Sequence, residues 1–193
     1  MPLSNALESY RKGRTFRTKE AVAAFLKQPS VFSRRKPIYF DEVENANVWS
    51  FYLVDRDLHH TFEEYVVARH LPAYANWSRQ LHLLGPTIER GTFPIAETAS
   101  HFFRPVPEAG HVMHYALEVL DLSDTSAVFG FAGFCERGGQ PPDQASVFAL
   151  WLRVFVEYRG SERVRAPLPL PVTTVLRADM ARPWGFLERP VTS

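Results

Sequence analysis

The order of strand-like and helical segments along the chain is the feature that most constrains its fold. Four segments rich in aromatic and β-branched residues follow one another in the second half and are separated by short turns; they are residues 93–103, 111–120, 126–135 and 145–158. Such runs predict β-strands, and short connections join antiparallel neighbours. A fifth strand is predicted upstream over residues 48–54.

A long helical segment separates this first predicted strand from the other four. Residues 61–84 carry apolar residues at helical spacing, Thr61 and Glu64 have the spacing of a capping box, and Pro72 divides the segment in two. A polar turn over residues 55–60 precedes it. Because a helix of this length must cross one face of an antiparallel sheet, the order of elements predicts an α+β fold.

Charge divides the 193-residue chain into two parts of different composition. The first 36 residues hold nine Lys or Arg and two acidic residues, a net charge of +7, whereas the remainder carries −6. We expect Thr18 to cap a short helix over residues 20–28, a basic linker over 30–37 to follow, and a last helix to span 172–178. The predicted organisation is a basic N-terminal extension (1–37), a main domain (38–178) and a C-terminal tail (179–193).

Several classes of protein are not favoured by the composition. The longest apolar stretch, residues 145–156, is interrupted by Ser146 and Arg153 and falls short of the ~18 residues of a membrane span. No secretory signal is recognisable, so we expect a cytoplasmic protein. The basic residues of the extension alternate with apolar ones, which favours a solvated helix or linker over an arm for nucleic acid or membrane. Metal-binding motifs are absent and Cys135 is the only cysteine, so we expect no metal or other cofactor.

The predicted elements, together with several short motifs, resemble the hotdog fold, in which a curved antiparallel sheet wraps around a central helix. More narrowly, the chain resembles the 4-hydroxybenzoyl-CoA thioesterase-like family over about residues 46–178. Four short motifs carry the resemblance. Asp55-Arg56-Asp57, followed by His59 or His60, corresponds to the family's Asp-x-Asp turn and its histidine, and Leu84-Gly85 corresponds to the end of the family's central helix. Arg104-Pro105 corresponds to the family's strand that ends in Arg-Pro, and Gly110 lies near the position of the family's Gly-Asp turn.

The resemblance implies a thioesterase that hydrolyses an acyl or aroyl thioester of CoA or acyl carrier protein. Such a reaction needs a carboxylate to activate water or attack the carbonyl, and donors for the oxyanion, which the N-terminus of the central helix would provide. Asp57 is the first candidate acid and Glu64 the second, although each is equally well explained as a helix cap. Glu63 replaces Glu64 if the helix register differs, and His60 is a candidate donor to the substrate carbonyl.

Further site residues are expected around these acids. Tyr65 is a candidate substrate contact, and Arg159, Arg163 and Arg165 follow the last strand, where they suit the phosphates of CoA or phosphopantetheine or simply form a solvated loop. The aromatic side chains of the strands form a core or line an acyl pocket. The family resemblance also implies a homodimer or larger homo-oligomer with its sites at the subunit interface.

The sequence leaves two alternative functions open. The family's glycine after the Asp pair and its Asn pair before the helix are absent, which leaves room for a hotdog dehydratase, lyase or cyclisation enzyme of polyketide or fatty acyl thioesters. That enzyme would use His60 with Asp57 or Glu64. The second alternative is a non-catalytic hotdog protein that binds an apolar ligand, since a fold does not determine a function.

Overall fold

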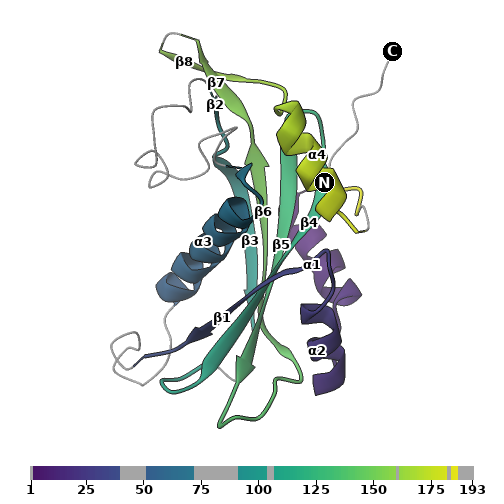
Figure 1. Ribbon diagram of the computed structural model, residues 1–193, viewed down its shortest axis with the longest axis vertical. Coiled ribbons are helices and arrows are strands. Elements are labelled where there is room, and N and C mark those ends of the chain that lie inside the picture. The colour runs from purple at the N-terminus through teal and green to yellow at the C-terminus, as the bar shows by residue number, and fades with distance from the viewer. Residues whose placement is uncertain are drawn as a thin grey trace.

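Antiparallel strands form the body of the protein in the computed structural model, which describes residues 2–39, 51–71, 91–103, 107–159, 161–181 and 184–186. The main sheet contains, in spatial order, β1 (Phe32–Pro37), β4 (Val112–Leu122), β5 (Ser126–Glu136), β6 (Ala145–Val154) and β3 (Ile95–Phe102). A small second sheet contains β2 (Gly91–Thr92), β7 (Val156–Arg159) and β8 (Glu162–Arg165). Figure 1 shows helices on both faces of the main sheet. The predicted α+β class is thereby confirmed.

The predicted strands of the second half are confirmed, with one change. The segments expected over 93–103, 111–120 and 126–135 correspond to β3, β4 and β5. The last predicted strand is divided, because β6 ends at Val154 and the chain continues after Phe155 into β7, which pairs with β2 and β8 instead of the main sheet. Phe155 itself is buried, so the apolar pattern runs through the break without interruption.

The first strand of the sheet lies earlier in the chain than predicted. Residues 32–37, expected to be a basic linker, form β1 and pair with β4. Lys36 and Arg34 occupy partly buried positions of β1 and form ion pairs with acidic residues of the helix that crosses the sheet. The inward positions of β1 are thus occupied by cations, and the alternation of apolar and polar residues that indicates a strand is missing. For this reason the prediction of a linker was wrong.

Helix α3 (Phe51–Ala68) crosses one face of the main sheet, here called the inner face. Val54, Leu58, Phe62 and Tyr65 recur at helical spacing and are buried against the strands. The strand predicted over 48–54 was therefore wrong for its described part. Its aromatic and β-branched residues have strand propensity, which the packing of this face overrides. The second half of the predicted helix, residues 72–84, lies outside the described residues.

The N-terminal extension covers the opposite, outer face of the sheet with α1 (Leu3–Gly13) and α2 (Lys19–Leu26). Thr18 caps α2 as predicted, because its side chain accepts a hydrogen bond from Ala21 N at 3.2 Å. Tyr10 of α1 packs so closely on β5 that a Cβ at Gly130 would lie 2.9 Å from its Cζ. The extension is thus packed against the sheet, and the expectation of a solvated helix or linker was wrong because the apolar residues between its charges are buried.

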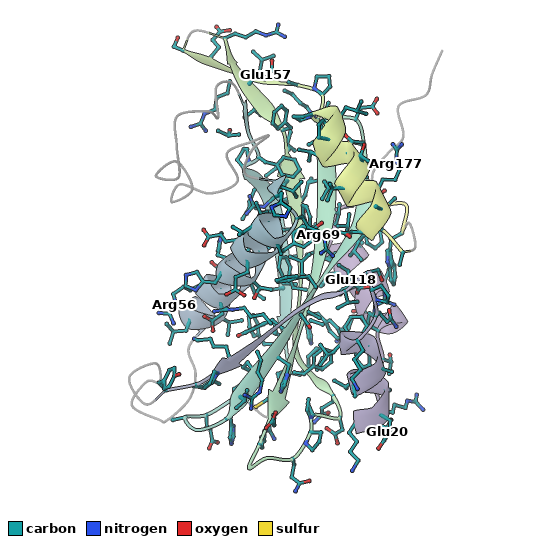
Figure 2. The ribbon with its side chains drawn as sticks, in the orientation of Figure 1. Glu20, Arg56, Arg69, Glu118, Glu157 and Arg177 are labelled. Atoms are coloured by element: carbon teal, nitrogen blue, oxygen red, sulfur yellow. The ribbon has the colours of Figure 1, made fainter. Side chains whose placement is uncertain are left out.

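Helix α4 (Leu170–Asp179) confirms the predicted C-terminal helix and packs beside α3 on the inner face. Its last residue, Asp179, accepts hydrogen bonds from Tyr65 Oη at 2.8 Å and Arg69 Nε at 2.7 Å. Arg69 lies near the C-terminal end of α3 (Figure 2). The tail returns to the outer face, where Trp184 N donates to Leu120 O at 3.0 Å. In the described part of the chain, no helix has the length and apolar character needed to cross a membrane.

Candidate active site

A cavity of about 230 Å³ lies between α3 and the inner side of strands β3 and β6. Its lining is mixed: Thr98 and Ser100 present hydroxyl groups from β3, while Trp151 of β6 and Leu58 of α3 present apolar surface. Among the described strands β3 has one neighbour, β6, so the cavity lies beside an edge of the sheet. Apolar walls with a few polar groups are typical of small-molecule sites.

Asp55 and His59 lie one helical turn apart on the side of α3 that faces this cavity. Asp55 lines the cavity, and His59 Nε2 lies 3.6 Å from Asp55 Oδ2, with both side chains about half exposed. The His59 ring packs on Trp151, another lining residue, with 4.5 Å between ring centroids. The pair therefore joins an accessible carboxylate at the cavity wall to an imidazole that packs on the wall residue Trp151.

The environment of His59 favours its neutral form. Burial against Trp151 lowers the pKa of His59 below its usual value of 6.5, the nearby Arg153 charge acts in the same direction, and Asp55 opposes both. A neutral imidazole can accept a proton near pH 7. The arrangement thus provides a base next to a carboxylate able to stabilise the imidazolium that forms.

Asp57, the first candidate acid, lies on another side of α3 and is completely buried. Its Oδ2 lies 2.8 Å from Lys36 Nζ and accepts a hydrogen bond from Tyr115 Oη at 3.4 Å. The expectation that Asp57 lies in a turn beside the helix N-terminus was wrong, because α3 begins at Phe51 and places it in the second turn. The buried ion pair with Lys36 explains this carboxylate as a link between α3 and β1.

Glu64 lies on the same side of α3 as Asp57, away from the cavity. Its carboxylate is half exposed and pairs with Arg34 Nε of β1 at 2.8 Å. The predicted capping box with Thr61 is absent, because Thr61 lies inside the helix and its hydroxyl donates to Asp57 O at 2.7 Å. The structure therefore does not place Glu64 at the start of a helix either.

The remaining predicted site residues do not gather at the cavity. His60 is partly exposed on α3 and is not among the lining residues. Tyr65 belongs to the core; burial and the Asp179 charge raise its pKa well above the usual value. The three predicted arginines belong to the β7–β8 hairpin, at the upper end of the molecule in Figure 1, and Arg165 donates there to Thr125 Oγ1 at 2.6 Å: Arg159, Arg163 and Arg165.

Sequence reasoning passed over Asp55 and His59 as site residues because it placed them in a turn. Their i, i+4 spacing is a signal only when both lie on a helix. Cys135, the single cysteine of the chain, is buried. In the described residues, no group of three or more His, Cys, Asp or Glu side chains is arranged to hold a metal ion.

Comparison with known proteins rests on structure alone, since neither a protein-family model nor a curated protein sequence matches the chain. A 1,4-dihydroxy-2-naphthoyl-CoA thioesterase from Synechocystis superimposes with a TM-score of 0.62 at 20% identity, covering 79% of this chain and 99% of its own. The 4-hydroxybenzoyl-CoA thioesterase from a Pseudomonas species has a TM-score of 0.61 at 16% identity, covering 75% and 98%.

The chain has the hotdog fold. A third structure, the dynemicin thioesterase, agrees with a TM-score of 0.64 at 10% identity, covering 79% of this chain and 99% of its own. The predicted resemblance to the 4-hydroxybenzoyl-CoA thioesterase group is thus confirmed at the level of the fold. In hotdog terms α3 is the central helix, and the candidate cavity lies between this helix and the edge strand β3.

Proposed function

We propose that this hotdog protein is a thioesterase that hydrolyses an acyl or aroyl thioester in the cavity between α3 and β3. The observation that carries the proposal is that Asp55 lines this cavity and pairs with His59, whose ring packs on the lining residue Trp151. The structural neighbours support it, since they include thioesterases for 1,4-dihydroxy-2-naphthoyl-CoA, 4-hydroxybenzoyl-CoA and gentisyl-CoA. A CoA thioester with a compact acyl group is the substrate class we infer.

Neutral His59 takes a proton from the water that attacks the thioester carbonyl, and Asp55 stabilises the resulting imidazolium. The first backbone N–H groups of a helix have no partner within it and carry a partial positive charge. We therefore assign the donors for the oxyanion of the tetrahedral intermediate to the N-terminal end of the central helix, as the family resemblance implies. Collapse of that intermediate breaks the carbon–sulfur bond, and the His59 imidazolium gives its proton to the departing thiolate, which leaves as the free thiol while His59 becomes neutral again.

The position of α3 suggests a second group of candidates for the catalytic carboxylate. The family resemblance implies a carboxylate in the turn between the first strand and the central helix. With β1 ending at Pro37 and α3 beginning at Phe51, that connection contains Asp41, Glu42 and Glu44. These three residues lie outside the part of the chain that the structure describes, so their role is proposed from sequence position only.

The substrate carrier and the assembly also belong to the proposal. Hydrolysis of a polyketide thioester of acyl carrier protein is the finer possibility that the family resemblance leaves open; among the structural neighbours, the dynemicin thioesterase binds a polyene. We propose a homodimer formed along β3, because this strand is an edge and Phe102 beside the cavity is 41% exposed. A second copy paired there would cover the cavity. Cytoplasmic location stays a prediction.

The test is a panel of aroyl- and acyl-CoAs given to the full-length protein, with free thiol and dehydrated product both monitored. Asp55→Asn and His59→Gln are expected to lower kcat/KM by about 10²–10⁴-fold, the usual contribution of a general acid or base. Glu64→Gln is the matched control, since this carboxylate pairs with Arg34 on the other side of the same helix. Asp41→Asn, Glu42→Gln and Glu44→Gln test the connection before α3.

Each pattern of results has a distinct meaning. Thiol release that persists in the Asp55 and His59 variants and disappears in Asp41→Asn, Glu42→Gln or Glu44→Gln contradicts the Asp55–His59 mechanism and retains the thioesterase. Dehydrated product without thiol release replaces hydrolysis with the dehydratase alternative, for which a His–acid pair is also suitable. Ligand binding without turnover of any thioester supports the non-catalytic alternative.

A further inference from the structure

A second cavity, of about 320 Å³, lies on the outer face of the sheet, where the C-terminal end of α1 meets the ends of β3 and β6. Its walls carry three cations of the N-terminal extension, and its apolar surface comes from three aromatic rings; these residues are Arg11, Lys12, Arg14, Phe16, Phe103 and Phe148. A volume of this size falls within the range of small-molecule sites, about 300–1,000 Å³. Neither the fold comparison nor the proposed hydrolysis uses it.

The charges around this outer cavity are unbalanced. Glu8 is the one acidic side chain among the described lining residues, and it pairs with Arg11 at 2.7 Å and more distantly with Lys12 at 3.5 Å. Arg14 pairs with Glu118 of β4, a residue that does not line the cavity. The lining therefore keeps a surplus of positive charge, carried partly by Lys12, whose side chain is 75% exposed.

The aromatic rings pack against other rings and form the apolar part of the cavity lining next to these cations. Phe103 packs edge-on against Phe148 with 5.7 Å between centroids, and the Arg11 guanidinium lies 5.6 Å from the centre of the Phe103 ring. Phe16 is held against Phe134 at 5.0 Å. Flat apolar surface next to guanidinium groups suits a ligand that is itself aromatic, because rings and guanidinium planes stack on one another.

The outer cavity is separate from the candidate active site although both lie at the same end of one strand. Phe102 lines the inner cavity and Phe103 lines the outer one. Phe103 N donates to Ser146 O at 2.9 Å, so the extended pairing with β6 continues through this residue and neighbouring side chains point to opposite faces. A ligand on the outer face therefore does not occupy the space of the thioester.

We propose that the outer cavity is a binding site for an aromatic anion, a flat apolar group that carries a phosphate, sulfonate or carboxylate. The ring lies against Phe16, Phe103 and Phe148, and the anionic group displaces the Glu8 carboxylate from Lys12 and Arg11. This site is independent of the proposed hydrolysis, and it gives the basic N-terminal extension a function besides covering the sheet.

Fluorescence titration of the full-length protein with 8-anilinonaphthalene-1-sulfonate tests the proposal, with N-phenyl-1-naphthylamine as the uncharged probe of the same rings. We expect one saturable sulfonate site. The double variant Arg11→Gln/Lys12→Gln weakens it about fivefold, the scale of a partly exposed ion pair, and Glu8→Gln strengthens it by about twofold or more because a competing carboxylate is removed. Ala145→Leu fills the cavity and weakens both probes.

Arg17→Gln/Lys19→Gln is the matched control, since these exposed cations belong to the same extension and do not line the cavity. Unchanged sulfonate affinity in both Arg11→Gln/Lys12→Gln and Ala145→Leu overturns the proposal, as does an equal loss in the control variant, which would show only general attraction to a basic surface. The opposite shift expected for Glu8→Gln keeps the test independent of misfolding. Adenosine 3′,5′-bisphosphate and benzoate as competitors then distinguish nucleotide from carboxylate ligands.

Discussion

Lys36 of β1 and Asp57 of α3 form an ion pair in the interior of the protein, with 2.8 Å between Nζ and Oδ2. Asp57 is completely buried and the Lys36 side chain is 12% exposed. Removing two charges from water is unfavourable unless each finds its partner, so the pair specifies how the central helix lies against the first strand. An acid that sequence reading assigned to catalysis thus links two elements of the fold.

Lys36→Met is therefore expected to lower the free energy of unfolding by about 3–5 kcal/mol, because it removes the 2.8 Å partner of a buried carboxylate and leaves the more distant Arg56 Nε, 3.9 Å from Oδ1. The double variant Lys36→Met/Asp57→Leu removes both charges and recovers most of this loss. Urea unfolding followed by circular dichroism measures each value. Arg34→Gln, which breaks the half-exposed pair with Glu64, is the control and lowers it by less than about 1 kcal/mol. A loss of similar size in Arg34→Gln would contradict the role of burial.

The pH dependence of activity is expected to follow His59. Burial lowers its pKa, so the neutral base persists below pH 6.5 and the acid limb of kcat/KM lies below that value. Asp55→Asn removes the group that raises this pKa and moves the limb to still lower pH. A pH–rate profile of each protein measures both positions, and a limb above pH 6.5 would show that another group is the base.

The same histidine links pH to stability. Below pH 6.5 the unfolded chain protonates His59 before the folded one does, so the unfolded state binds more protons. The stability due to neutral His59 is therefore complete above pH 6.5 and decreases as the pH falls toward the folded pKa. The free energy of unfolding, measured with urea at pH 7.5 and at pH 5.5, is expected to decrease less between the two pH values for His59→Gln than for the unchanged protein. Equal decreases would contradict the linkage.

Tyr10 is expected to be the main anchor of the N-terminal extension. It is fully buried on the outer face, and its hydroxyl donates to Glu118 Oε2 at 2.9 Å. Tyr10→Ala removes the ring and lowers the free energy of unfolding by about 3–5 kcal/mol. Tyr10→Phe removes one donor while Arg14 still pairs with Glu118, and lowers it by about 0.5–1.5 kcal/mol. Equal, small effects in urea unfolding would show that the extension is not anchored here.

Cys135 is expected to react slowly with thiol reagents in the folded protein. It is 8% exposed, and burial raises its pKa above the usual 9.0, so little thiolate forms at neutral pH. Measured with an aromatic disulfide reagent at pH 8, the reaction is expected to accelerate at least about tenfold in 6 M urea, where the thiolate fraction and the access both return to those of a free cysteine. A fast reaction of the folded protein would instead indicate an activated thiol.

Much of the fold was predictable because its signals are local. Strands β4 and β5 carry dense aromatic and β-branched residues with turns between them, and Thr18 begins α2 with the chemistry of a cap. These patterns depend on neighbours within a few residues. β1 escaped prediction because its inward positions hold Arg34 and Lys36, whose partners lie in α3.

The prediction of the catalytic acid depended on where the central helix begins. With the central helix expected from residue 61, Asp57 was placed at its N-terminus, whereas both acids lie inside α3, where Asp57 faces Lys36 and Asp55 faces the cavity. A shift of two positions along a helix rotates a side chain by about 200°, which decides whether a carboxylate is buried or accessible.

By itself, the sequence determined the α+β class, most strands of the sheet and the resemblance to the hotdog fold, since these depend on local propensity and on the order of elements. The tertiary structure alone decided which acid is buried and which lines the cavity, because that depends on helix register against the sheet. It also decided the place of the basic extension, since the apolar face of α1 matches a surface formed by strands β3 to β6, which lie far along the chain.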